Sequence, residues 1–176
     1  KLKMTLREGY QPELESWLQK HEIDLAVTLL DGRPGPGINS LALLKLPLVL
    51  LVEKSSRLAS AADLWKRDRI EDTLISLPAN EAICKNFLQG LGRLDVDWFT
   101  GIEVSSLNLI ETYVANGYGI GLAVLAPKAK TLPQIRVLAL DDFAPVTLGA
   151  IWQGKPTPLM QAFLTEMQNR VQALLK

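Results

Sequence analysis

The fold is decided by residues 98–125, WFTGIEVSSLNLIETYVANGYGIGLAVL. The two ends of this segment are short apolar runs typical of strands, and its middle carries apolar residues at helical spacing. Ser105 or Ser106 can cap the start of the helix, and Asn116 with Gly117 supplies its end. The segment therefore predicts a strand, a helix and a second strand, which is the repeating unit of an α/β fold.

The same alternation extends through the rest of the chain. Residues 2–7 alternate polar and apolar side chains, which predicts an edge strand, and residues 23–30 resemble a strand buried on both faces of a parallel sheet. With a helix over 12–21 between them, the chain is expected to open as a βαβ unit. Further strands are expected at 38–45, 47–52, 73–77, 135–140 and 146–152, and further helices at 61–66, after a cap at Asn80, and from Thr157 onward. In the last helix the inward positions are expected to be Met160, Phe163, Leu164, Met167, Val171, Leu174 and Leu175.

Two lobes are expected from this pattern. A polar stretch over 53–72 separates the early strands from the later ones, and it is expected to hold the first boundary. The first lobe would comprise 1–70 together with 150–176, and the second lobe 71–149.

The composition excludes several classes of protein. Nineteen Lys and Arg side chains balance nineteen Asp and Glu side chains, so the chain shows no long-range attraction to nucleic acid or to an acidic membrane. Its longest apolar stretch, 41–52, is interrupted by Lys45 and Pro47 and is far shorter than the roughly 20 residues that span a bilayer. The first eight residues do not resemble a signal peptide, so a cytoplasmic location is expected.

Catalytic and metal chemistry find little support in the sequence. The single histidine, His21, is expected to cap a helix end, and the single cysteine, Cys84, to pack inside a helix face. These two residues make neither a zinc ligand set nor a Cys–His dyad with an orienting partner. The glycines after Asn116 follow a helix and precede a strand, which is the reverse of a phosphate-binding turn. The chain is therefore expected not to be an enzyme, with no cofactor and no metal.

Small hydroxyl residues mark the junctions between strands and helices. Thr28 and Ser76 lie near the ends of two expected strands, and Ser105 and Ser106 follow a third. Ligands of open α/β sheets bind beyond the carboxyl ends of strands, where helix N-termini offer N–H groups to anions. Each residue alone could be an ordinary helix cap or strand end. Their joint placement on two lobes is what predicts a ligand cleft.

Four stretches resemble the effector-binding domain of LysR-type transcriptional regulators. They are LKMTLREG at 2–9, IDLAV at 23–27, LPLVLLV at 46–52, and EVSS at 103–106 followed by VANGYGIGL at 114–122. The resemblance covers essentially all 176 residues. It implies two α/β lobes like those of type 2 periplasmic binding proteins, with mixed sheets flanked by helices. A small effector such as a carboxylate would bind between the lobes.

The resemblance also implies a set of site residues and partners. The cleft positions that it implies are Thr28, Ser76, Ser105, Ser106 and Leu125. Regulators of this family form dimers or tetramers and bind DNA through an N-terminal winged helix-turn-helix. That module and the first strand–helix unit of the family's domain have no counterpart in 1–176, so DNA contact is expected only through a domain outside this segment.

Two other functions remain open from the sequence. A solute-binding protein of the same fold would deliver its ligand to a transporter and would work outside the cytoplasm. An enzyme would have to use carboxylates in the cleft, because the chain holds one histidine and one cysteine.

Overall fold

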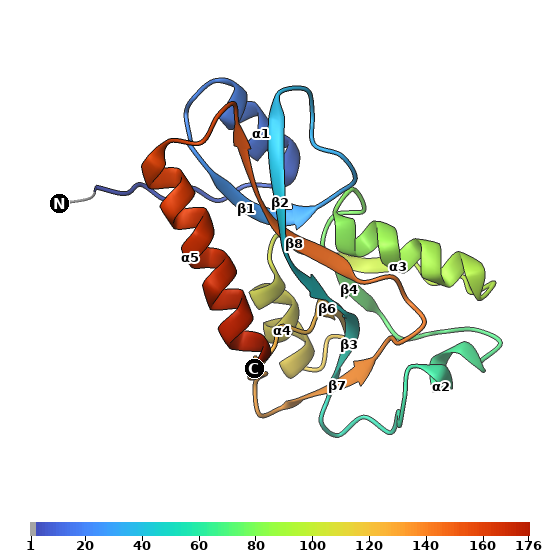
Figure 1. The fold of residues 1–176 in the computed structure, drawn as a ribbon. Helices are drawn as coiled ribbons and strands as arrows, with labels where there is room; N and C mark the ends of the chain where they lie inside the picture. The colour runs from blue at the N-terminus through green and yellow to red at the C-terminus, as the bar shows by residue number, and fades with distance from the viewer. Residues whose placement is uncertain (1–2) are drawn as a thin grey trace. The chain divides into compact units, whose positions relative to one another are not determined.

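The computed structural model describes residues 3–176, which fold into helices and strands (Figure 1). The strands are β1 (Ala26–Leu30), β2 (Ile38–Leu46), β3 (Leu48–Glu53), β4 (Leu74–Ser76), β5 (Thr100–Glu103), β6 (Ile120–Val124), β7 (Ile135–Ala139) and β8 (Val146–Gln153). The helices are α1 (Gln11–Gln19), α2 (Ala62–Trp65), α3 (Ala82–Arg93), α4 (Leu107–Ala115) and α5 (Pro158–Leu175). Every element predicted from residue 12 onward has a counterpart, and the α/β class is confirmed.

The chain divides into two compact units. Unit 1 comprises Lys1–Leu44 with Thr147–Lys176, and unit 2 comprises Lys45–Val146. These limits differ from the lobes expected from the sequence, because residues 45–70 group with unit 2. The reason is β3, which pairs antiparallel with both β6 and β7 and so ties the stretch to the second sheet.

Unit 1 is built on a sheet of three strands in the order β1-β8-β2. β1 pairs antiparallel with β8, with Thr28 opposite Gly149, so the expected parallel strand pair and βαβ opening are wrong. Residues 3–10 form no strand, and Leu2 lies outside the described residues. An alternating segment becomes a strand only where a neighbour accepts its hydrogen bonds. No described strand pairs with residues 3–10 or with the outer side of β1.

Helix α1 covers one face of this sheet. Leu14 and Leu18 pack against Ala26 and Ile151 in a buried cluster. The helix ends at His21, whose φ of 55° is left-handed and whose N–H donates to the Leu18 carbonyl at 3.0 Å. The backbone of His21 therefore closes the end of α1, as in a Schellman turn, and the expected role of its side-chain charge stays a prediction.

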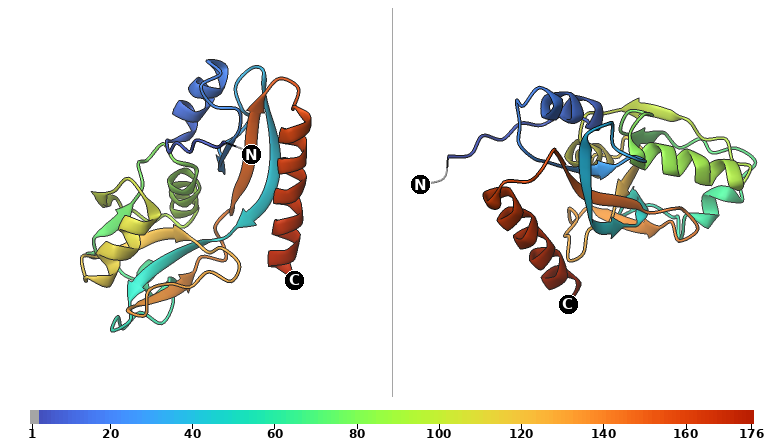
Figure 2. Two further views of the ribbon diagram at one scale, coloured as in Figure 1. Left: turned by 90° about the vertical axis from the view of Figure 1, so that its left-hand side faces the viewer. Right: turned by 45° about the horizontal axis from the view of Figure 1, so that its top comes forward.

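Helix α5 lies on the opposite face of the sheet from α1 (Figure 2). Thr157 caps it as predicted, since its hydroxyl accepts from the Met160 N–H at 3.2 Å. Of the positions predicted to face inward, only Leu164 and Val171 are buried, and Phe163 is among those that are exposed. Leu174 and Leu175 are also exposed. A narrow stripe of the helix meets the sheet, and no described residue covers the apolar side chains beside it.

Unit 2 is built on a mixed sheet of five strands in the order β5-β4-β6-β3-β7. β4 lies between β5 and β6 and runs parallel to both, whereas β3 runs antiparallel to β6 and β7. The arrangement confirms the mixed sheet expected from the sequence. It also brings the carboxyl ends of β4, β5 and β6 to one edge of the sheet.

An aromatic cluster fills the core of unit 2 next to α3. The rings of Phe87 and Phe143 stack with centroids 5.4 Å apart, and Trp65 and Trp98 contact them edge-on or tilted. Gly90 of α3 lies directly under the Phe143 ring, where a Cβ atom would clash with it. Trp65 lies in the connection that leads into β4, and Trp98 lies in the connection that leads into β5, so the two connections share one aromatic core.

The residue that caps α3 differs from the prediction. The N-cap is Glu81 and not Asn80, because a turn from the Pro78 carbonyl to the Glu81 N–H at 3.0 Å places Asn80 ahead of the helix. α3 begins without a side-chain cap hydrogen bond. In residues 3–176, no helix combines the length and apolar character required to cross a membrane.

Candidate functional site

The carboxyl ends of three parallel strands form the candidate site of unit 2. β4 ends at Ser76, β5 ends at Glu103 beside it, and β6 ends at Val124. The Val104 N–H donates to the Ser76 carbonyl at 2.9 Å, which ties the two strand ends together. Helices α3 and α4 begin just beyond β4 and β5, so their N-termini open at the same edge.

Ser106 is the residue that caps α4. Its hydroxyl oxygen accepts from the Leu109 N–H at 3.3 Å. A hydroxyl that accepts in this way keeps its own O–H to donate to a ligand. Ser105 precedes it and is exposed. The structure thus places both serines at the strand-to-helix junction, as the sequence predicts.

Ser76 lies inside unit 2, with 1% of its surface exposed. Its hydroxyl donates to the Leu77 carbonyl at 2.9 Å and is 2.8 Å from the Thr100 hydroxyl. Cys84 also donates to the Leu77 carbonyl, at 3.1 Å. Ser76 therefore holds the end of β4 from within and does not present its hydroxyl at the surface.

A small cavity of about 20 Å³ lies beside Ser76, lined by α3 and by the neighbouring strands. This volume is close to that of a single water molecule, so the cavity is too small for an effector. Burial raises the pKa of the Cys84 thiol to about 11, with a smaller contribution from the nearby carboxylates of Glu81 and Glu103. The thiol is neutral at physiological pH and packs inside the unit, as predicted for Cys84.

Thr28 and Leu125 complete the residues predicted for the site. Thr28 is half-buried on β1 and belongs to unit 1. Leu125 directly follows β6 and is 38% exposed, and its N–H donates to the Pro47 carbonyl at 3.0 Å. Of the predicted site residues, Ser76, Ser105 and Ser106 lie together in unit 2, because β4 and β5 end side by side.

Thr100 is a residue that sequence reasoning missed. It begins β5, and its hydroxyl pairs with Ser76 across the parallel strands. A threonine at the start of a strand is common, so the sequence alone gives no signal for it. The pairing of β4 with β5 is what brings the Thr100 hydroxyl to Ser76. In the part of the chain that the structure describes, no three His, Cys, Asp or Glu residues are grouped so that they could hold a metal ion.

Comparison with known families decides what this fold belongs to. The model of the LysR substrate binding domain matches residues 1–172. The chain belongs to this family. The LysR substrate-binding domain is a part of transcriptional regulators and is not a family of enzymes.

Several solved structures have the same fold as this LysR substrate-binding domain. The cofactor-binding domain of the Cbl transcriptional regulator matches with a TM-score of 0.78 and 19% identity, over 92% of this chain and 72% of that chain. The Synechocystis CcmR regulatory domain, solved in complex with 2-PG, matches with a TM-score of 0.74 and 17% identity, over 92% of this chain and 80% of that chain. These likenesses confirm the type 2 periplasmic-binding-protein-like fold.

Longer regulators contain this domain as one part. HinK, a LysR family transcriptional regulator from Pseudomonas aeruginosa, matches with a TM-score of 0.76 and 19% identity over 94% of this chain. The LysR substrate-binding domain described here spans 58% of the HinK chain. None of the curated proteins matches the chain.

Proposed function

We propose that this chain is the effector-sensing domain of a LysR-type DNA-binding regulator. A small molecule would bind this domain and bias the conformation of the regulator, with no bond made or broken. The observation that carries the proposal is the family match over residues 1–172. The geometry of unit 2 supports it, because two serines and two helix starts meet at one edge of parallel strands.

The residues of the proposed site have different roles. Ser105 and Ser106 would donate to the effector together with backbone N–H groups at the helix starts. Ser76 would not contact the effector but would hold the end of β4 in place through its hydrogen bond with Thr100. Thr28 would contribute from the first lobe, and Leu125 would supply an apolar rim.

A carboxylate is the effector class that the helix starts favour. The N-terminus of a helix attracts anions through its unpaired N–H groups and its dipole. α3 begins without a side-chain cap, so the first turn of α3 keeps N–H groups for a ligand. That a small molecule binds this fold is in keeping with two similar structures, since the CcmR regulatory domain was solved with 2-PG and the BenM variant structure is described as an effector binding domain.

The setting of the domain follows from the same proposal. The regulator would act in the cytoplasm as a homo-oligomer and would contact DNA through a separate N-terminal domain. Binding of DNA by such a regulator has a precedent, since full-length CbnR was solved in complex with its target DNA. A solute-binding protein that serves a transporter is the other function of this fold. It is less well supported, because the matched family is a domain of regulators.

The test combines a ligand screen with a pair of variants. Thermal unfolding of the chain would be measured with a panel of small mono- and dicarboxylates, and with amines and alcohols of the same size. A ligand present at a hundred times its Kd stabilises by about 2.7 kcal/mol, which for this size raises Tm by roughly 5–10 °C. The double variant Ser105→Ala, Ser106→Ala should lose most of that shift, whereas Ser55→Ala, an exposed serine elsewhere in unit 2, should keep it. A full shift in the double variant would show that the effector binds elsewhere.

A further inference from the structure

A second cavity lies in unit 2 at the other end of the parallel strands. It is open to solvent on one side and has a volume of about 520 Å³. It is lined by the connections that lead into β4 and β5, at residues 65, 67–70, 72 and 94–99. Small-molecule pockets typically enclose roughly 300–1,000 Å³. Because these residues precede the strands, the cavity opens away from the edge where Ser105 and Ser106 lie.

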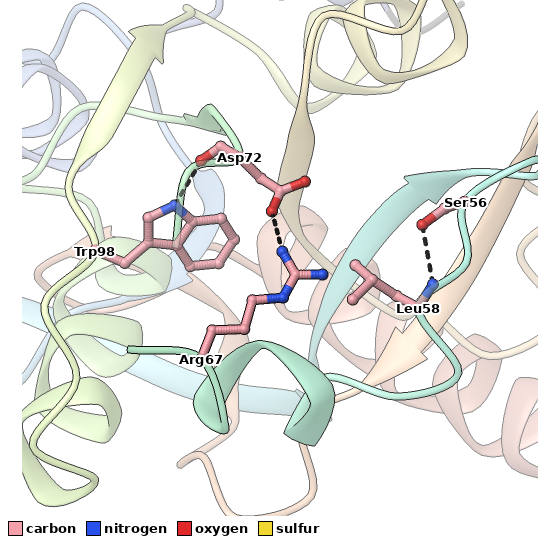
Figure 3. Close-up of polar contacts among 5 residues, drawn as sticks. All are labelled: Ser56, Leu58, Arg67, Asp72 and Trp98. Atoms are coloured by element: carbon pink, nitrogen blue, oxygen red, sulfur yellow. Dashed lines mark hydrogen bonds and ion pairs between the residues drawn. The ribbon is translucent and has the colours of Figure 1, made fainter. Parts of the chain in front are cut away.

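The two connections are joined by a fixed framework. The Trp98 indole N–H donates to the Asp72 carbonyl at 2.8 Å, and Arg67 pairs with the Asp72 carboxylate at 2.7 Å (Figure 3). The rings of Trp65 and Trp98 meet edge-to-face with centroids 6.2 Å apart. Trp98 is 4% exposed, so the aromatic wall is anchored in the core of the unit.

The connection that precedes β4 is braced along its length. Ser56 accepts from the Leu58 N–H at 3.3 Å (Figure 3). Arg136 of β7 donates to the backbone carbonyls of both Ser56 and Leu58. Asp63 accepts from two backbone N–H groups in the same connection, and these bonds lower the pKa of its carboxyl. The cavity is therefore framed by connections that are held in place.

The charges around the cavity favour a cation. Four carboxylates and two guanidinium groups line it, which leaves a net charge of −2. The Arg67 charge is already neutralised by Asp72. Among residues 3–176, neither Asp95 nor Asp97 has an ion pair, and both are exposed at the rim. Phe99 stands beside them with 77% of its surface exposed, and its ring is free to cover an apolar ligand.

We propose that this cavity is a second binding site, for a small organic cation with an apolar or aromatic body. The ammonium group would lie near Asp95 and Asp97, and the body would lie against the rings of Trp65 and Phe99. An aromatic face attracts a nearby cation, and a carboxylate at about 5 Å adds to the attraction even in a water-like dielectric. The site is independent of the effector edge and does not depend on the proposed function.

Phenethylamine is the probe that tests the proposal. The indole N–H signals of the four tryptophans would be followed by ¹H–¹⁵N NMR during titration of the whole chain. The signals of Trp65 and Trp98 should move with saturation, whereas those of Trp17 and Trp152, which lie in unit 1, should stay. The neutral phenethyl alcohol and the anionic phenylacetate should move neither pair at the same concentration.

Variants then separate this site from general attraction to charge. The double variant Asp95→Asn, Asp97→Asn should weaken phenethylamine binding by about sixteenfold, since each carboxylate near 5 Å contributes roughly fourfold. Asp141→Asn removes an exposed carboxylate of unit 2 that does not line the cavity, so it should bind phenethylamine as the wild type does. Phe99→Ala should weaken binding with little effect on folding.

Three results would overturn the proposal. One is no saturable movement of the Trp65 and Trp98 signals with phenethylamine at millimolar concentration. The others are an equal response to the neutral alcohol and an equal loss of binding in Asp141→Asn. The Ser105→Ala, Ser106→Ala variant should still bind the amine, so failure of the effector site and failure of this site give different outcomes.

Discussion

The hydroxyl pair of Ser76 and Thr100 provides a quantitative test of how unit 2 is held together. Ser76→Ala removes two hydrogen bonds, one to Thr100 and one to the Leu77 carbonyl. A buried hydrogen bond contributes about 1 kcal/mol net, so the variant should lose about 2 kcal/mol of unfolding free energy. Thr100→Ala removes one of these bonds and should lose about 1 kcal/mol. The double variant should lose about 2 kcal/mol, which gives a coupling of about 1 kcal/mol between the two residues.

The assay is urea unfolding followed by tryptophan fluorescence, because Trp65 and Trp98 report on unit 2. Thermal unfolding should agree, with Ser76→Ala lowering Tm by roughly 4–8 °C for a chain of this length. The reasoning is refuted if Ser76→Ala loses less than about 0.5 kcal/mol, or if the losses of the two single variants add without coupling. Either result would mean that the Ser76 hydroxyl does not stabilise unit 2 through Thr100.

Three more predictions concern helix packing and the buried thiol. Gly90→Ala should destabilise unit 2 by about 1–3 kcal/mol in urea unfolding, because the new methyl group would clash with the Phe143 ring. Gly92→Ala should leave the stability unchanged or raise it by up to about 1 kcal/mol, because no atom lies within 4 Å of the new methyl group. Equal effects of the two changes would contradict this packing. Cys84 should react with iodoacetamide far more slowly in the folded chain than in urea at pH 8, because a thiol pKa of about 11 in place of 9.0 leaves roughly a hundredfold less thiolate. The same pKa shift makes the free energy of unfolding depend on pH. The stability that the neutral thiol contributes is full below pH 9 and is lost as the pH rises through about 11. Comparable alkylation rates in both states would show that the thiol is accessible. In α5, Leu164→Ala should lower the free energy of unfolding by about 2–5 kcal/mol, whereas Phe163→Ala should change it by no more than about 0.5 kcal/mol. Similar losses in the two variants would mean that the Phe163 side chain is covered in solution.

Most of the elements could be predicted because their signals are local. Thr157 and Ser106 cap helices three residues before the N–H that they accept from, and such spacing is visible in a sequence. The strand expected at residues 2–7 could not be judged in this way, because a strand depends on its partner. The pairing of β3 with β6 and β7 is likewise a long-range property, and it moved the boundary of unit 2 away from residue 70.

The candidate site was predicted in part for the same reason. The position of Ser76 at the end of β4 follows from its sequence, but its burial depends on Thr100 in a strand 24 residues later. A serine that faces a ligand and a serine that faces a neighbouring strand have the same local pattern. The aromatic cavity had no local signal at all, since its lining comes from two connections that meet only in the folded unit.

The outer side of β1 has a consequence for handling the chain at high concentration. No described strand pairs with that side, and Val27 of β1 is 48% exposed. A free strand edge is a template on which another chain can add a strand, and natural sheets protect such edges with charge, proline or covering segments. Solutions of this chain should therefore aggregate as concentration rises, and Val27→Lys should delay that onset more than a lysine at an exposed position outside the edges of this sheet would.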